Sequence, residues 1–170
     1  MINPHRFSIG PTDAQIAMLR WGENGRPPAL LVHGTGFVAD VWDEVARELA
    51  STYTVYALDR RGHGASHKPD AYHFLDFAED VCRVIDALDL RDIYGIGHSA
   101  GATDLLLATK LRPGRFTRLF VMEPTVMSSR RMPGPLQHWR IVSCSPARHL
   151  HVASRDWSES RRSLMSRAGG

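Results

Sequence analysis

Apolar residues recur along this chain in two rhythms, one typical of strands and one typical of helices. Continuous or alternating apolar runs, bounded by Gly, Pro or Asp, predict strands. These runs cover residues 7–9, 15–20, 29–32, 53–58, 93–96 and 118–122. Apolar residues three or four positions apart predict helices over 40–50, 74–88 and 103–111. In the first of these helices, Val41, Val45 and Leu49 form the single apolar face.

The order of these elements indicates the fold class. After a first pair of strands, strands and helices alternate, which predicts an α/β fold with a mostly parallel sheet covered by helices on both faces. Ligands bind such sheets at the carboxyl ends of the strands. His33, Asp59, Ser99 and Glu123 each follow a predicted strand. We therefore expect these four side chains to share one edge of the sheet.

One of these positions, Ser99, lies in the segment Gly97-His98-Ser99-Ala100-Gly101 between a predicted strand and a predicted helix. A Gly-x-Ser-x-Gly segment in this setting is typical of a nucleophile elbow, a tight turn that exposes the serine oxygen above the sheet. The flanking glycines let the strand and helix approach each other closely. Gly-x-Ser-x-Gly also occurs by chance in ordinary loops, so the segment alone does not establish a catalytic serine.

Two upstream loops extend the pattern to a family resemblance. His33-Gly34-Thr35-Gly36 follows the third predicted strand, and residues 59–66, Asp-Arg-Arg-Gly-His-Gly-Ala-Ser, follow the fourth. Together with the elbow, these motifs resemble those of α/β-hydrolases over residues 5–127. The resemblance implies that residues 1–127 are the N-terminal part of such a domain, incomplete at its C-terminus.

The resemblance also implies roles for individual residues. Ser99 would be the nucleophile, and the backbone N–H of Ala100 would form an oxyanion hole with that of Thr35 or Gly36. A serine nucleophile indicates acyl chemistry through an acyl-enzyme, on esters, thioesters, lactones or C–C bonds beside a ketone. We expect a small-molecule substrate and no cofactor. A non-catalytic remnant of the same ancestry is the alternative.

The acid and base of a catalytic triad are harder to place. Glu123 ends the next strand after the elbow, where some relatives carry the triad acid. The alternative is a structural role as a helix or loop cap before Pro124. Of the downstream histidines His138, His149 and His151, none follows a predicted strand, and no base is identified among them.

Several other polar residues of these loops have a structural interpretation. We expect His33 to shape the oxyanion loop, Asp59 and His63 to anchor their glycine-rich loop, and His98 to pack away from the nucleophile. Cys82 falls on the apolar face of its predicted helix, which favours a buried thiol.

Residues 128–170 differ in composition from the body. From residue 130 onward the chain is rich in Arg and Ser, so it can bury little apolar surface, and we expect disorder or loose packing. The net charge of +3 on the whole chain comes from this segment. A frameshift or gene fragment would explain the change, and the nucleotide sequence would test it. A body lacking its second half would expose a sheet edge and aggregate.

Composition further limits the kinds of site, targeting segment and partner that we expect. The chain has 170 residues, 43% of them hydrophobic, and two cysteines, Cys82 and Cys144, with no CxxC pair. This argues against a disulfide scaffold or zinc site.

We expect neither a signal peptide nor a membrane span, and we expect the protein to be cytoplasmic. We expect no nucleic-acid partner, although a weak binding role for the basic tail is a further alternative. The sequence leaves the substrate and oligomeric state open.

Overall fold

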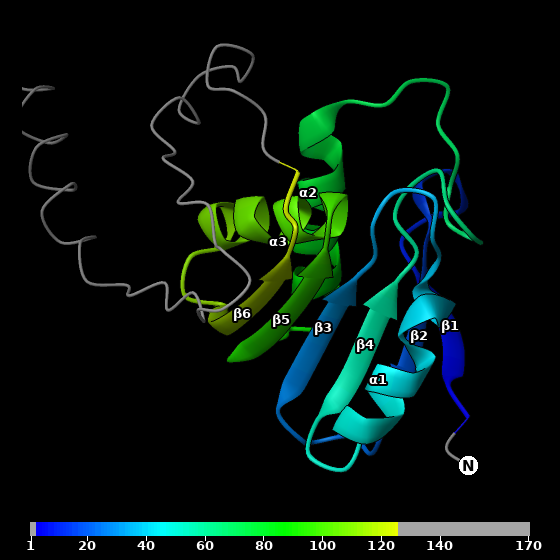
Figure 1. The fold of residues 1–170 in the computed structure, drawn as a ribbon. Helices are drawn as coiled ribbons and strands as arrows, with labels where there is room; N and C mark the ends of the chain where they lie inside the picture. Colours follow the sequence, from blue (N-terminus) through cyan, green and yellow to red (C-terminus); the bar gives the residue numbers. More distant parts are fainter. Residues whose placement is uncertain (1–2, 126–170) are drawn as a thin grey trace, which may run out of the picture.

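All six predicted strands form, and they assemble into one sheet in the computed structural model, which describes residues 3–125 (Figure 1). The strands are β1 (His5–Ile9), β2 (Ile16–Trp21), β3 (Pro28–Val32), β4 (Thr54–Leu58), β5 (Ile93–His98) and β6 (Phe116–Met122). Their order across the sheet is β1-β2-β4-β3-β5-β6. The last four in this order are parallel, and β1 and β2 are antiparallel additions at one side. The predicted α/β fold with a mostly parallel sheet is confirmed.

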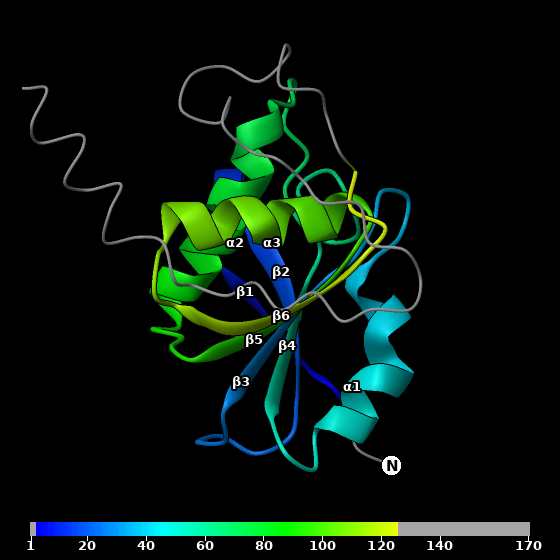
Figure 2. The same cartoon turned by 60° about the vertical axis from the view of Figure 1, so that its left-hand side comes forward.

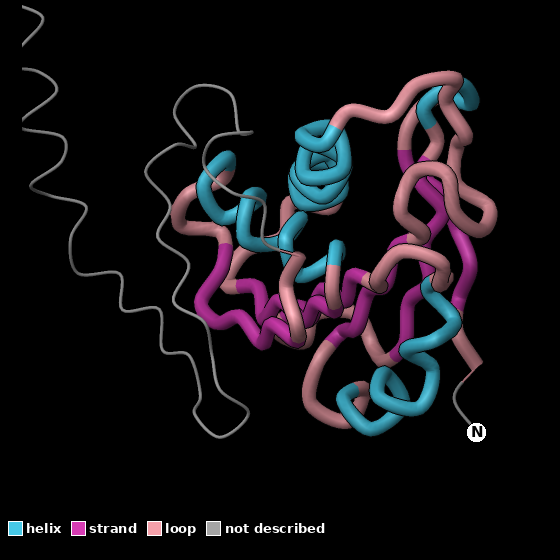
Figure 3. Tube along the Cα trace, turned by 45° about the horizontal axis from the view of Figure 1, so that its top comes forward, coloured by secondary structure: helices cyan, strands magenta, loops and turns pink. Residues whose placement is uncertain are grey.

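Helices cover both faces of this sheet, as the alternating order predicted. The helices are α1 (Asp43–Leu49), α2 (Phe74–Ala87) and α3 (Ala100–Leu111), with short 3-10 turns η1 (Thr12–Ala14) and η2 (Ala39–Trp42). Figures 2 and 3 show α1 on one face and α2 and α3 on the other. α3 begins directly after Ser99, three residues earlier than its apolar pattern indicated.

Strand β3 shows why the continuous apolar runs predicted central strands. Its side chains alternate between the two faces of the sheet. Leu30 and Val32 join the core beneath α2 and α3, whereas Ala29 and Leu31 join the core beneath α1. All four are fully buried, so neither face of the strand tolerates a polar residue.

The helix predicted over 40–50 forms as η2 and α1, and of its predicted apolar face Leu49 packs against the core, whereas Val41 and Val45 do not. Val41 and Val45 are 52% and 43% exposed. The side that packs on the sheet carries Trp42 and Ala46, together with Ala39 and Ala50. The small alanine side chains let the helix lie close to the strands. The exposed valines and the buried alanines both recur every four residues, so the two rows have the same helical period. Periodicity therefore could not choose between the two rows.

Strand β6 is one of the two edge strands of the sheet formed by residues 3–125, and β1 is the other. Phe120 of β6 is 45% exposed, which agrees with the expectation of an open sheet edge bearing apolar surface. The expectation of loose packing for residues 128–170 concerns residues outside the described range.

Candidate active site

Ser99 occupies the sharp turn between β5 and α3. Its backbone has φ 51° and ψ −121°, a conformation that costs a non-glycine residue about 1–3 kcal/mol. Its N–H donates to the carbonyl oxygen of Met122 at the end of β6, with an N–O distance of 2.8 Å. The turn is thus held against the neighbouring strand, and Ser99 remains partly exposed. This is the backbone geometry that the elbow motif predicted.

The two glycines of the motif allow close backbone approach. A Cβ on Gly97 would lie 2.6 Å from Cα of Ala102, in the first turn of α3. A Cβ on Gly101 would lie 2.7 Å from the carbonyl carbon of Val32 and closer still to two carbonyl oxygens at the end of β3. Real Cβ contacts do not fall below 3.0 Å. Both glycines therefore seat α3 tightly on β5 and β3.

The loop after β3 lies beside this turn. A Cβ on Gly34 would lie 3.1 Å from the Cβ of Ser99, so the two segments are in contact. Gly36 N–H donates to Nε2 of His63 at 3.2 Å. By contrast, the backbone N–H groups of Thr35 and Ala100 have no hydrogen-bond acceptor within residues 3–125. Of the two predicted loop donors, Thr35 is the one whose N–H is unoccupied.

His33 is a buried structural group of this loop. Its Nε2 accepts from the N–H of Arg60 at 3.0 Å, so Nδ1 carries the proton and donates to the carbonyl of Gly34 at 2.8 Å. Burial lowers the pKa of His33 to about 4, so the ring is neutral near pH 7. With both nitrogens occupied, it shapes the loop as expected from the sequence.

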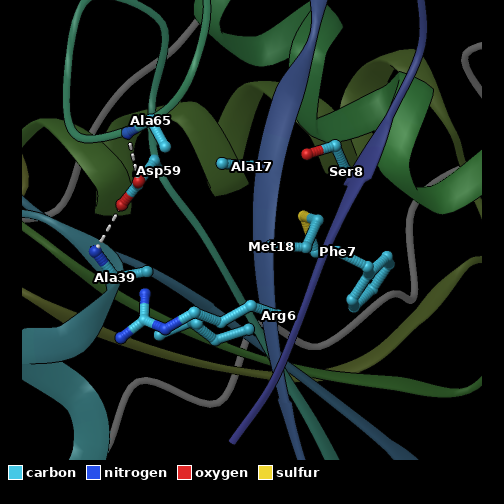
Figure 4. Close-up of a pocket in the computed structure, with 9 residues that line it drawn as sticks. Arg6, Phe7, Ser8, Ala17, Met18, Ala39, Asp59 and Ala65 are labelled. Carbon is cyan, nitrogen blue, oxygen red and sulfur yellow. Dashed lines mark hydrogen bonds between the residues drawn. The ribbon is translucent and has the colours of Figure 1, made fainter.

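Asp59 and His63 also anchor loops, in agreement with their structural interpretation. The Asp59 carboxylate accepts from the N–H of Ala39 at 2.7 Å and from that of Ala65 at 2.8 Å (Figure 4). His63 Nδ1 lies 3.0 Å from the carbonyl oxygen of Arg61, so both of its ring nitrogens are engaged. The pocket in Figure 4, of about 220 Å³, borders Asp59 but not Ser99.

The acid and base are not assembled in the part of the chain that the structure describes. The Ser99 Oγ lies 3.4 Å from Oγ1 of Thr125, a neighbour that no sequence motif marked. Glu123 is exposed at the end of β6, with a left-handed φ of 47°, and its role as acid stays a prediction. The ring of His98 packs against that of Phe37, with centroids 6.0 Å apart. The downstream histidines of the tail lie outside the described residues.

Other kinds of site find little support in residues 3–125. No cluster of three metal-ligating side chains is present there. None of the helices in this range has the length and hydropathy to cross a bilayer. Cys82 is buried on α2 as expected, and burial raises the pKa of its thiol to about 11, so it is not a reactive thiolate.

Comparison with known proteins identifies the family. A family model described as "Alpha/beta hydrolase family" matches residues 29–169. The chain belongs to the alpha/beta hydrolase family. Among individual relatives, a non-heme chloroperoxidase of Streptomyces lividans is 38% identical over 112 residues, which cover 63% of this chain and 41% of the relative.

Solved structures of the family share the same architecture. The thioesterase domain from the curacin biosynthetic pathway superposes with a TM-score of 0.68 and 30% identity, over 72% of this chain and 47% of that domain. A bacterial membrane phospholipase A has a TM-score of 0.68 and 32% identity, over 75% of this chain and 42% of the phospholipase. The chain therefore spans less than half the length of these relatives.

Proposed function

We propose that this chain carries the nucleophile and oxyanion hole of a serine hydrolase that cleaves acyl bonds through an acyl-enzyme at Ser99. The observation that carries the proposal is the strained backbone of Ser99 on the β5–α3 turn, beside two backbone N–H groups that have no acceptor among residues 3–125. Strain of this kind persists where surrounding packing enforces it, and it clusters at reactive residues. Gly97 and Gly101 supply that packing here.

The arrangement supports a defined sequence of steps. Ser99 Oγ attacks the carbonyl carbon of an ester, thioester, lactone or ketone-flanked C–C bond, and a general base takes its proton. The negative charge that develops on the substrate oxygen is stabilised by the N–H groups of Thr35 and Ala100 and by the N-terminus of α3. The leaving group departs with a proton, and water then releases the acyl group from Ser99.

The two structural relatives are consistent with this acyl chemistry, since one is a thioesterase domain and the other a phospholipase A. Glu123 remains our candidate for the acid that orients the base, because it ends β6 at the same sheet edge as Ser99. The substrate is a small molecule, and we propose no cofactor and no nucleic-acid partner. We propose a cytoplasmic location.

Covalent labelling tests the nucleophile directly. A fluorophosphonate probe should label the protein, and mass spectrometry of the digest should place the adduct on Ser99. Labelling should disappear in Ser99→Ala and persist in Ser51→Ala, a remote exposed serine used as the matched control. Absence of labelling in a folded wild-type chain would mean that the site is not a competent nucleophile.

A non-catalytic remnant is the second candidate. It is favoured by one observation: the hydroxyl partner of Ser99 is Thr125, and no histidine of residues 3–125 hydrogen bonds to Ser99 Oγ. Hydrolysis of p-nitrophenyl acetate separates the two candidates. The remnant predicts that Ser99→Ala leaves the background rate unchanged, whereas the hydrolase predicts that the substitution abolishes turnover.

A further inference from the structure

A buried ion pair lies between the loop after β4 and the nucleophile helix. Arg60 Nε donates to Oδ2 of Asp104 at 2.6 Å, and the two side chains are 5% and 1% exposed. Asp104 lies on α3 five residues after Ser99, one turn and a half along the helix. The pair thus ties the loop after β4 to the element that carries the nucleophile.

The same arginine also contacts the loop after β3. Its Nη1 donates to Oγ1 of Thr35 at 3.3 Å, and its backbone N–H donates to Nε2 of His33 at 3.0 Å. These two residues flank Gly34, which packs against Ser99. The guanidinium is held in place by the ring of Phe77 on α2, with its central carbon 4.4 Å from the ring centroid.

The ion pair is poorly arranged for stability alone. Two charges are removed from water, and such pairs often contribute less than apolar residues of the same size. Oδ1 of Asp104 has no hydrogen-bond partner in the described part of the chain. In addition, burial raises the pKa of Asp104 to about 6, so its ionised form is disfavoured relative to water even with Arg60 beside it.

The surroundings of Thr35 indicate a role for the Arg60–Asp104 ion pair other than stability. Thr35 to Val38 are exposed, and the contacts that hold this stretch are few. Gly36 N–H donates to His63, Phe37 N–H donates to the carbonyl of Gly34, and the Phe37 ring packs against His98, but none of these contacts involves the Thr35 side chain. Thr35 has one side-chain hydrogen bond within residues 3–125, and Arg60 supplies it. The second donor of the oxyanion hole, the N–H of Ala100, belongs to α3, to which Arg60 is also bound through Asp104.

We propose that Arg60 is a positioning residue that holds the Thr35 N–H at a fixed place relative to the Ala100 N–H. The inference rests on the proposed function, because it assigns these groups to the oxyanion hole. Arg60 suits this task since its planar fork binds two partners at once, Asp104 through Nε and Thr35 through Nη1. A lysine has a single ammonium and cannot reproduce that geometry.

The test compares Arg60→Lys with Arg61→Lys. Arg61 is the adjacent residue, and it forms partly buried ion pairs with Asp80 and Asp76 on α2. Its side chain has no hydrogen bond to Thr35, His33 or α3, so it controls for loss of an arginine from this loop. Two readouts are measured, the rate constant of fluorophosphonate labelling and the backbone order parameter of Thr35 from ¹⁵N relaxation.

Arg60→Lys should lower the labelling rate about 10- to 100-fold, since a misplacement of about 1 Å at an active site costs on that order. The Thr35 order parameter should fall from about 0.85 toward 0.6, the range of flexible loops. Arg61→Lys should match wild type in both. Thr35→Val, which removes only the Oγ1 acceptor, should shift both readouts in the same direction.

Each result decides a separate claim. If the wild type is not labelled, the proposed function fails, while the order parameters still decide the positioning role. If Arg60→Lys keeps a rigid Thr35, or changes no more than Arg61→Lys, the positioning role is wrong. If Arg60→Lys does not fold, Thr35→Val decides, and a wild-type order parameter in that variant overturns the proposal.

Discussion

Replacing Gly101 with alanine probes the packing that seats the nucleophile helix. Gly101 is the second residue of α3, where helix propensity alone favours alanine over glycine by up to about 1 kcal/mol. The structure predicts the opposite sign. The new methyl group would lie 2.7 Å from the carbonyl carbon of Val32 and closer to the carbonyl oxygens of Val32 and His33.

These neighbours are backbone atoms of a central strand, so they cannot rotate away. Relief to an ordinary carbon contact of about 3.5–4.0 Å requires α3 to move by about 1 Å. Overpacking of a rigid core typically costs about 1–3 kcal/mol. After the propensity gain is subtracted from this cost, Gly101→Ala should lower the free energy of unfolding by about 1 kcal/mol.

Urea denaturation followed by circular dichroism measures this loss from the shift in midpoint at constant slope. Gly114→Ala is the matched control, because a Cβ on Gly114 meets no atom within 4 Å. Its φ of 81° is left-handed, so alanine there should cost about 1 kcal/mol from backbone strain alone. A Gly101→Ala variant as stable as wild type, or more stable, would refute the close approach of α3 to β3.

Two other predictions follow from strain and burial at the same site. Ser99→Gly should be about 1 kcal/mol more stable than Ser99→Ala, because glycine accepts the φ of 51° without strain. Urea denaturation measures both variants, and equal stabilities would contradict a strained backbone at Ser99. Protonation should also couple to stability. Burial lowers the pKa of His33 to about 4. As the pH falls from 6.5 to 4, the unfolded state therefore binds a proton at His33 before the folded state does, and the free energy of unfolding falls by about 3 kcal/mol. Asp104, with its pKa raised to about 6, binds its proton first in the folded state, so over the same interval it raises stability by up to about 3 kcal/mol. Asp104→Asn lacks this compensating gain, so its free energy of unfolding should fall more steeply than that of wild type between pH 6.5 and 4. Urea denaturation at each pH measures this difference, and equal slopes for the two proteins would contradict a raised pKa of Asp104 in the folded state.

The strands and the elbow could be predicted from sequence because their causes are local. A short run of continuous apolar residues such as Leu30 and Leu31, with prolines before it and a glycine after it, favours a strand buried on both faces. The positions of Gly97 and Gly101 around Ser99 encode a close approach that only glycine permits. In these cases the residue type itself carries the structural constraint.

The exposed Val41 and the buried Arg60 could not be predicted, because their environments depend on distant partners. Arg60 finds its carboxylate on Asp104, 44 positions away in the chain, and composition rules place both residues at the surface. An aspartate within the otherwise apolar start of α3 was the single sequence signal for this contact. The choice between Thr35 and Gly36 similarly needed the hydrogen bond from Gly36 to His63.

The two halves of a serine hydrolase site differ in what they require of the chain. The oxyanion donors are backbone groups, so their placement depends on the packing of α3 and the loop after β3, all within the described residues. The base is a side chain, and no histidine in this range hydrogen bonds to Ser99 Oγ. Slow labelling of wild type that falls further in Arg60→Lys but not in Arg61→Lys would therefore mean a formed oxyanion hole acting without an efficient base. Equal slow labelling of all three proteins would mean instead that Arg60 does not position the Thr35 N–H, and that Ser99 reacts at a rate which this side chain does not set.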